Sequence, residues 1–235
     1  MCGRIALYSD PPRLARLVEA GIDPDLVDGV TPHWNVGPTA TILGARESSD
    51  GHRVLRAYRW GLVPKAAKDA SAHKGAFNAR AETVASRQMF RNAFMRSRAL
   101  IPADGFFEWK TMGKAKQPYY FHRADGFPMV FAGLTEYWRG EGADAIHSAT
   151  IITTASGSDM DGIHDRMPVI LEQGAWDHWL DPELIDRDDL ESMLQPAPEG
   201  TLVHYPVGRE VGNIRNDRPE LLQPAPEVTP LNLGW

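Results

Sequence analysis

Cys2 is the only cysteine in the 235-residue sequence, and it directly follows Met1. A structural cysteine usually lies in a core, whereas chain ends fray unless something ties them down. Aminopeptidases generally remove Met1 when the next residue is small, so we expect a mature chain that begins with Cys2. Its α-amine and its thiol would then lie on adjacent carbons, with ordinary pKa values of about 7.7–8.0 and about 8.5.

Such an amine–thiol pair can react in two ways. The thiolate can attack an acyl carbon, with the amine as its base. Alternatively, the amine can condense with an aldehyde to an imine, and the thiol can close onto that carbon to form a thiazolidine. A terminal cysteine without a role is a third interpretation, and the position of Cys2 alone does not decide between them.

Three further segments carry polar residues in surroundings typical of a core: KGAFNARAET, ADGFFEWK and DGIHDRMPVIL. Asn78 in the first offers a donor and an acceptor that can orient an amine or a carbonyl. Glu108 in the second lies between aromatic residues, which raise a carboxyl pKa toward that of a general acid/base. His164 in the third precedes an apolar strand, a common general acid/base position. A helix cap, an outward-facing carboxylate and a structural histidine are the respective alternatives.

Arginines lie within two residues of three of these groups, at Arg4, Arg80 and Arg166. The planar guanidinium matches two phosphate oxygens, so convergence of the segments would indicate an anionic substrate. Ion pairs with some of the 31 acidic residues are the alternative. Trp60 and other aromatic residues between these segments would suit stacking on single-stranded nucleic acid if exposed, although we expect most of them in the core.

The composition is ordinary for a globular protein, with 43% hydrophobic and 24% charged residues. A net charge of −6 argues against bulk attraction to nucleic acid, although a local basic groove remains compatible with it. One cysteine excludes an intramolecular disulfide, and neither a secretory signal nor a membrane span is visible, so we expect a cytoplasmic protein. The sequence has no zinc-ligand or phosphate-loop motif, and we expect no metal and no cofactor.

The pattern of elements favours an α+β fold. Predicted strands outnumber predicted helices, and tight turns join many strand pairs, including two ADG turns at 103–105 and 124–126. Helices are predicted over 9–21, 82–97, 175–180 and 188–195, and single strands over 39–45, 52–63, 147–156 and 167–172. Two strands joined by an ADG turn are predicted over each of 98–110 and 118–134. We therefore expect a single domain of curved, mainly antiparallel, barrel-like sheets with flanking short helices.

Taken in order, seven segments resemble the SOS response-associated peptidase (SRAP) family: MCGR, WNVGPT, RWGLVP, FNARAET, ADGFFEWK, GIHDRMP and VGNIRNDRPELLQP. The combination is highly specific, although no single segment is. The resemblance runs from Cys2 to about Pro224, which predicts a family domain over 1–224 and a C-terminal tail over 225–235.

The resemblance implies a protein that recognises abasic sites in single-stranded DNA. The ring-opened deoxyribose exposes an aldehyde, which the N-terminal Cys2 condenses into a thiazolidine DNA–protein crosslink that shields the lesion. The expected partner is therefore single-stranded DNA that contains abasic sites, bound by a monomer in the cytoplasm at the nucleoid.

The resemblance also implies roles for the singled-out residues. Cys2 would be the covalent nucleophile and Asn78 would position it. Glu108 would shuttle protons, and His164 would assist sugar opening and strand cleavage by β-elimination, an AP-lyase activity. The family's peptidase activity would be self-removal of Met1 or proteolytic release of the crosslink.

Four further residues are expected to hold DNA. Arg4, Arg80 and Arg166 would bind the phosphates that flank the lesion, and Trp60 would contact or wedge against neighbouring bases.

Two other classes of function compete with this interpretation. An N-terminal-nucleophile hydrolase, such as a glutamine amidotransferase domain, would use the Cys2 thiol on an amide with Asn donors at the oxyanion. A non-covalent reader of damaged DNA would bind without bonding to it. The first leaves the arginines unexplained, and the acidic composition weakens the second.

Overall fold

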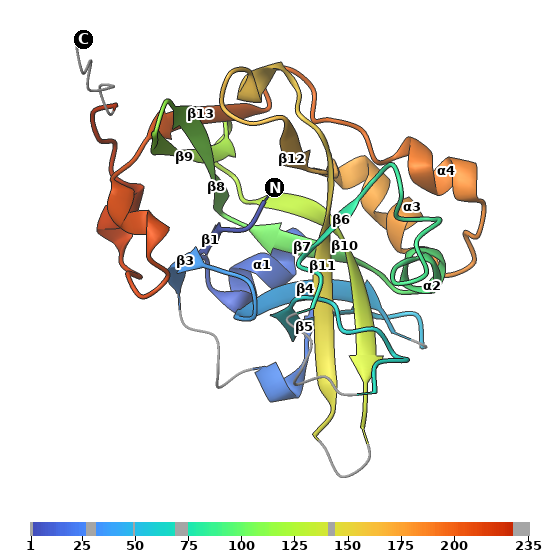
Figure 1. Cartoon of the computed structure of the whole chain (residues 1–235). Helices are drawn as coiled ribbons and strands as arrows, with labels where there is room; N and C mark the ends of the chain where they lie inside the picture. The colour runs from blue at the N-terminus through green and yellow to red at the C-terminus, as the bar shows by residue number, and fades with distance from the viewer. Residues whose placement is uncertain (1, 27–31, 49, 69–74, 141–143, 228–235) are drawn as a thin grey trace.

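Five strands close into a barrel at the centre of the molecule. The computed structural model describes residues 2–26, 32–48, 50–68, 75–140 and 144–227 (Figure 1). The barrel strands are β4 (Thr41–Glu47), β5 (Arg53–Trp60), β7 (Arg98–Ala103), β10 (Met129–Trp138) and β11 (Ile146–Ala155). Neighbours pair in the antiparallel order β11-β10-β7-β4-β5. A parallel pairing of β5 with β11, Ser148 opposite Arg59, completes the ring.

Three short strands extend the barrel sheet at its edges. β2 (Gly21–Ile22) lies beside β5, while β6 (Asn78–Arg80) and β12 (Arg166–Pro168) lie beside β11. Both β6 and β12 begin or end at residues that the sequence analysis singled out. The edge of the barrel at β11 therefore carries two of the candidate segments.

A second, five-stranded antiparallel sheet packs beside the barrel. Its order is β13 (Leu202–Pro206), β9 (Ala115–Arg123), β8 (Gly105–Met112), β1 (Ile5–Leu7) and β3 (His33–Val36). Phe106 of β8 and Phe121 of β9 stack at 4.9 Å between ring centroids, and Phe106 also contacts the barrel residue Phe131 edge-on. These aromatic contacts join the two sheets into one hydrophobic core.

Short helices flank the sheets, as expected. They are α1 (Pro11–Leu17), α2 (Arg91–Arg96), α3 (Trp176–Leu180) and α4 (Arg187–Ser192), with 3₁₀ turns η1 (Pro24–Leu26), η2 (Ser158–Met160), η3 (Gln173–Ala175), η4 (Arg209–Gly212) and η5 (Pro219–Leu222). Asp10 caps α1 by accepting from the Arg13 N–H at 2.7 Å, and prolines occupy its first turn. The α+β single-domain fold with barrel-like sheets is confirmed.

The predicted helix over 82–97 is wrong for most of its length. Only α2 is helical, whereas residues 81–90 form successive turns. The N–H groups of Ser86 and Arg87 both donate to the Thr83 carbonyl, and the Ser86 hydroxyl also donates to it at 3.1 Å. Thr, Val and Ser have low helix propensity because their side chains are restricted or bond to the backbone, so the helix begins later.

The two ADG segments do not form hairpins. β7 and β8 belong to different sheets, as do β9 and β10, so the chain crosses between the sheets at each ADG. At the first crossing a Cβ on Gly105 would lie 2.3 Å from the Tyr120 ring, so only glycine permits this approach. The buried Asp104 carboxylate accepts from the N–H groups of Tyr8 and Ser9, at 2.7 and 2.8 Å. This crossing thereby holds the chain just after β1.

No helix among the described residues is both long and apolar enough to cross a lipid bilayer.

Candidate active site

Cys2 lies where the two sheets meet. It lies shortly before β1, which pairs with β8 through Ile5 and Ala6 and with β3 through Ile5 and Leu7. The Phe107 N–H donates to the Arg4 carbonyl at 2.9 Å. Figure 1 shows the N-terminal end of the chain at the centre of the molecule, beside β8 and β6. The Cys2 side chain is fully buried. The beginning of the chain is therefore tied down, unlike a fraying terminus.

Asn78 holds the backbone of Cys2. Its Nδ2 donates to the Cys2 carbonyl at 2.8 Å and to the Phe77 carbonyl at 2.8 Å. Parallel pairing of β6 with β11, Asn78 opposite Ile151, fixes this position. The Asn78 Oδ1 atom is buried and accepts no hydrogen bond from any described residue. It is an acceptor available to an N–H or O–H group beside Cys2.

Glu108 points inward from β8 and is only 3% exposed. Its neighbour Phe107 is fully buried on the other face of the strand, because both faces of β8 are covered at this point. Burial raises the pKa of Glu108 to about 7. Burial, followed by the Glu108 charge, raises the pKa of the Cys2 thiol. The thiol is therefore protonated near neutral pH, with a carboxyl group that titrates there close by.

His164 lies beside Glu108, with 3.7 Å between His164 Nε2 and Glu108 Oε2. The Arg166 N–H donates to His164 Nδ1 at 3.0 Å. In the neutral ring the proton is therefore assigned to Nε2, on the side of Glu108. Burial is the main cause that lowers the pKa of His164, so the ring is neutral near pH 7. The Asp165 carboxylate lies 3.2 Å from Nδ1.

Four candidate catalytic residues thus converge from four parts of the chain: Cys2, Asn78, Glu108 and His164. The arrangement combines a protonated thiol, a carboxyl group with a pKa of about 7 and a neutral imidazole. Such groups can take up and deliver protons during addition to a carbonyl carbon. Among the described residues no group of three or more His, Cys, Asp or Glu side chains could hold a metal ion.

The three arginines near these groups differ in how they are engaged. Arg4 donates to Asn35 Oδ1 at 2.8 Å and to the Val211 carbonyl at 2.6 Å, and its guanidinium lies 5.7 Å from the Trp109 ring centroid. Arg166 forms a two-pronged ion pair with Glu82. Arg80 is exposed and forms no ion pair with any described residue.

Trp60 is placed differently from the other expected DNA contacts. It is fully buried, and its Nε1 donates to the Phe77 carbonyl at 2.9 Å. In this structure the ring offers no surface to a base, so the geometry does not support the expected contact. Instead, the indole holds the backbone just before Asn78.

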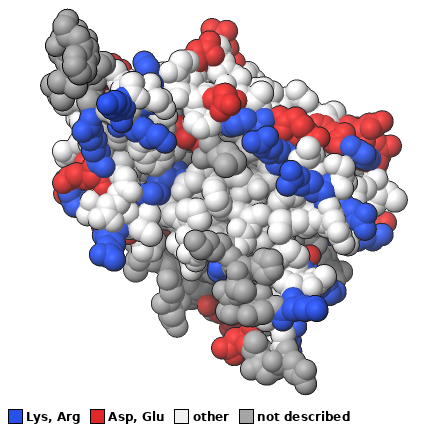
Figure 2. All heavy atoms as spheres, in the orientation of Figure 1, with Lys and Arg blue, Asp and Glu red and all other residues white. Residues whose placement is uncertain are grey.

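Sequence reasoning missed three exposed arginines that continue from Arg80: Arg87, Arg91 and Arg96. None of them forms an ion pair within the described part of the chain. Figure 2 shows Lys and Arg gathered in a diagonal band over the region of β6 and α2. The available signal was the stretch TVASRQMFRNAFMRSR, residues 83–98, which contains arginines and no acidic residue. Its fourth arginine, Arg98, is buried and donates to carbonyl groups instead.

Comparison with known proteins gives consistent matches over most of the chain. The chain is 37% identical over 222 residues to the Bacillus subtilis "Abasic site processing protein YoqW", covering 94% of this chain and 98% of that protein. It is 34% identical over 225 residues to the Escherichia coli "Abasic site processing protein YedK", covering 94% and 98%. It is 31% identical to the Gallus gallus "Abasic site processing protein HMCES", covering 86% and 67%.

Solved structures share the fold. A crystal structure of a protein from Bacteroides thetaiotaomicron superposes with a TM-score of 0.85 at 24% identity, covering 95% of this chain and all of that one. A second, from Bordetella bronchiseptica, has a TM-score of 0.74 at 28% identity, covering 88% and 100%. The family profile described as "SOS response associated peptidase (SRAP)" matches residues 1–214. The chain therefore belongs to the SRAP family.

Proposed function

We propose that this protein processes abasic sites, and that it does so in single-stranded DNA through a covalent thiazolidine formed by Cys2 after removal of Met1. The names of the relatives support abasic-site processing. The observation that carries the covalent mechanism is the buried carboxyl group of Glu108, with a pKa of about 7, beside the Cys2 thiol. Met1 lies outside the described residues, so its removal is part of the proposal.

The reaction forms two bonds to one carbon. The Cys2 amine attacks the aldehyde carbon of the ring-opened deoxyribose and gives a carbinolamine. Loss of water gives an imine, and the thiol sulfur then adds to the same carbon. The thiol proton ends on the ring nitrogen, and the aldehyde oxygen leaves as water. No oxidant or reductant takes part.

The geometry supports a separate task for each side chain. Glu108 protonates the departing hydroxyl and then accepts the thiol proton, because a carboxyl group with a pKa of about 7 can do both near neutrality. The Asn78 amide holds the Cys2 carbonyl, and its Oδ1 accepts from the attacking amine. His164 donates from Nε2 to the sugar ring oxygen as the ring opens.

Burial of the thiol supports a single-stranded substrate. A sugar that reaches a fully buried group must leave the base stack, and this costs least in an unpaired strand. Arg80, Arg87 and Arg91 supply exposed guanidiniums without carboxylate partners in the described part of the chain, as phosphate binding requires. Arg4 and Arg166 act in the same reaction by ordering the segments around Cys2 and His164.

The imine stage also accounts for the lyase activity that we propose as a side reaction. An imine at the former aldehyde carbon acidifies the adjacent C–H. The Glu108 carboxylate beside His164, having given its proton to the departing hydroxyl, can take that C–H proton as the 3′ phosphate leaves. Self-removal of Met1, or proteolytic release of the crosslink, would be the peptidase activity. We place the protein in the cytoplasm at the nucleoid, as a monomer.

Blocking the N-terminus tests the role of the amine. A variant with an extra residue before Cys2 that prevents Met1 removal is expected to form no crosslink with an abasic oligonucleotide, while its thermal unfolding stays unchanged. Mass spectrometry of the wild-type product is expected to give the summed masses less one water. A crosslink that persists in the blocked variant would exclude the amine. Glutaminase activity without DNA would favour the amidotransferase alternative instead.

A further inference from the structure

A cavity of about 350 Å³ lies beside the candidate active site and plays no part in the mechanism above. One wall is formed by residues 33–41, which comprise β3 and the turn into β4. The other wall is formed by Ile214 and Asp217, which follow η4. The volume is at the lower end of that found for small-ligand sites and suits a group the size of one nucleotide.

Side chains from both walls hold the cavity open. The Asn35 Nδ2 donates to three carbonyl groups between residues 211 and 216, at 2.7–3.1 Å. The Asp217 carboxylate accepts from the Trp34 N–H at 2.6 Å and pairs with His33 Nδ1 at 2.5 Å. A cavity that is already formed loses little conformational freedom when it binds a ligand.

Arg4 connects this cavity to the reactive thiol. Its guanidinium donates to Asn35 Oδ1 at 2.8 Å, while its backbone lies two residues from Cys2. At Gly37, in the cavity wall, a Cβ would lie 3.6 Å from Arg4 Nε and 3.1 Å from Ile214 Cγ2. The Arg4 Nε atom is buried and has no hydrogen-bond partner among the described residues. Arg4 thus links the wall of the cavity to the segment of chain that carries Cys2.

The rim has the features of a nucleotide contact. The Ile214 side chain is 57% exposed, which is unusual for isoleucine. The next residue, Arg215, is exposed and forms no ion pair within the described segments. Opposite them, Thr39 has a φ of 76°, a strained backbone conformation that clusters at binding sites. An exposed apolar side chain beside a cation suits a base and its phosphate.

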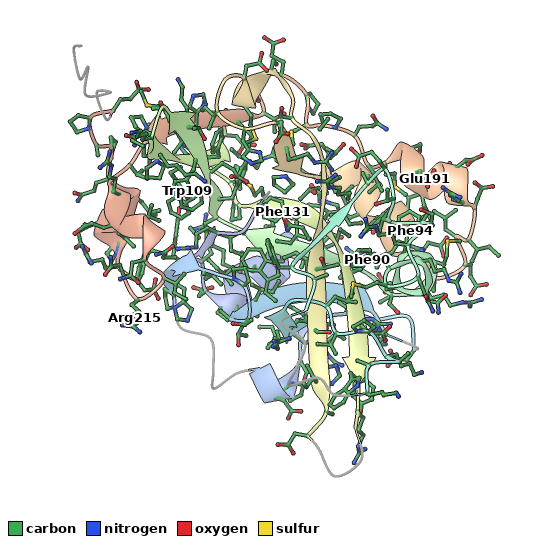
Figure 3. All side chains as sticks on the ribbon, in the orientation of Figure 1. Phe90, Phe94, Trp109, Phe131, Glu191 and Arg215 are labelled. Atoms are coloured by element: carbon green, nitrogen blue, oxygen red, sulfur yellow. The ribbon has the colours of Figure 1, made fainter. Side chains whose placement is uncertain are left out.

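The cavity lies on one side of Cys2, and the exposed arginines Arg80, Arg87 and Arg91, here called the arginine row, lie on the other. Figure 3 shows Arg215 at the lower left, beside β3, whereas Phe90 and Phe94 of the α2 region lie on the right. The N-terminal end of the chain lies between them (Figure 1). Basic side chains occur on both sides of this face and leave its centre uncharged (Figure 2). A DNA strand that binds the arginine row through its phosphates and places one sugar at Cys2 would reach the cavity with its next nucleotide.

We infer that this cavity receives the base of a nucleotide next to the abasic sugar, on the side away from Arg80 and Arg87, with Ile214 against the base and Arg215 at its phosphate. The inference rests on the proposed function and adds a binding subsite to it. One flank of the DNA then binds through phosphates alone, and the other flank also through a base.

The test compares Ile214→Ala with Ile185→Ala, because Ile185 is equally exposed, at 60%, but lies between α3 and α4. Crosslinking rates are measured against the concentration of a single-stranded abasic oligonucleotide. Ile214→Ala is expected to raise the half-saturating concentration by about fivefold or more, the loss typical of one stacked base. The maximal rate and the melting temperature should stay unchanged, and Ile185→Ala should match the wild type.

A second set of oligonucleotides carries an inert baseless spacer in place of the nucleotide on one side of the lesion or the other. The wild type is expected to lose affinity for only one of the two, and Ile214→Ala to lose that difference. Equal affinity of the wild type for both, or equal effects of the two alanine variants, would overturn the subsite. If the wild type forms no crosslink, the proposed chemistry fails, and fluorescence anisotropy with the same oligonucleotides decides the subsite separately.

Discussion

We expect Glu108 to control the reactivity of Cys2. Burial and the Glu108 charge both raise the pKa of the thiol, so a free thiolate is not the resting state. In the proposed mechanism the thiol therefore needs a base at the moment it attacks, and we expect the carboxyl group with a pKa of about 7 to be that base. In this proposal Glu108 adds to the effect of burial in keeping the thiol protonated at rest, and it accepts the thiol proton during the reaction.

The pH dependence of crosslinking follows from this arrangement. A plot of the wild-type crosslinking rate against pH is expected to change slope near pH 7, because Glu108 changes its charge there. Glu108→Gln is expected to remove that change of slope and to lower the rate by about 10²–10⁴-fold, with DNA binding little changed. Single-turnover crosslinking from pH 5 to pH 9 checks this. Equal losses in binding and rate would make Glu108 a structural residue.

Glu108 also affects the stability of the fold. Its folded-state pKa of about 7 lies above the ordinary value of 4.5, so the fold favours the neutral carboxyl. The stability contribution is fully present below pH 4.5 and is lost as pH rises through 7. The difference between the two pKa values corresponds to at most roughly 3 kcal/mol of unfolding free energy. The melting temperature of Glu108→Gln is therefore expected to be higher than that of the wild type at pH 8 and equal to it at pH 5. The same difference at both pH values would contradict the raised pKa.

Residue types singled out the candidate catalytic residues and the family resemblance implied their roles, but neither predicted the orientation of each side chain. Strand alternation left Glu108 undecided between facing inward and outward, because alternation assumes one exposed face, whereas β8 is covered on both at Phe107 and Glu108. Trp60 shows the opposite case. Its type and neighbours suggested a surface for bases, and only the packed fold shows that the ring is buried.

At the scale of elements, the segment from β6 to α2 carries the arginines expected to bind DNA. Arg87 and Arg91 are exposed and lack carboxylate partners in the described part of the chain. Arg187 is also exposed, but it pairs with Glu191 within α4. The comparison separates arginines without a carboxylate partner among the described residues from an arginine that is paired within its own helix.

Replacing Arg87 and Arg91 together by Gln is therefore expected to weaken binding of single-stranded DNA and to flatten its salt dependence. The slope of log affinity against log salt should fall by about 0.7 for each lost phosphate contact. Fluorescence anisotropy between 50 and 300 mM salt, roughly the range in which such slopes are measured, checks this. Arg187→Gln is the matched control and should keep the wild-type slope. An unchanged slope in the double variant would place the DNA elsewhere.

The two ADG crossings give a matched pair for stability. Asp104 is buried and accepts from two backbone N–H groups and the Ser9 hydroxyl. Asp125 occupies the same place in the second ADG but is exposed and pairs with Arg123. Asp104→Ala is expected to lower the unfolding free energy by about 2–4 kcal/mol, because it leaves buried donors unsatisfied. Asp125→Ala should cost less than about 1 kcal/mol. Similar losses in denaturant unfolding would contradict the assigned role of Asp104.

The two ADG crossings also show that local sequence could not predict which strands pair with each other. A tight ADG turn between two apolar strands predicts a hairpin, yet each ADG here joins two different sheets. Likewise, the apolar pattern at Phe90 and Phe94 predicted helix as far back as residue 82, whereas the backbone bonds of Thr83 and Ser86 form turns. Short-range patterns report which residues are buried and not which strand covers them.

At the scale of the whole molecule, the candidate site requires both sheets. Glu108 lies in the five-stranded sheet, and Cys2 lies shortly before its strand β1. Asn78 begins β6, which pairs with the barrel strand β11, and His164 lies two residues before β12. The sequence predicted the α+β class and the barrel-like sheets from its many short strands. It could not predict which strands close the barrel, because the parallel pairing of β5 with β11 joins residues far apart in the chain.

The domain boundary at residue 224 remains a prediction. The family profile ends at residue 214, while the Ala225 N–H donates to the Pro206 carbonyl at 2.9 Å beside β13. Of the predicted tail over 225–235, residues 228–235 lie outside the described part of the chain.

One gel shows directly whether Cys2 forms a covalent bond with abasic DNA. The protein is mixed with a single-stranded oligonucleotide that carries one abasic site, beside intact and duplex controls, and is run under denaturing conditions with Cys2→Ala in parallel. The account predicts a heat-stable shifted band for the single-stranded abasic DNA alone, absent with Cys2→Ala. No shifted band from protein whose Met1 is shown by mass spectrometry to be removed, or an equal band with Cys2→Ala, would contradict it.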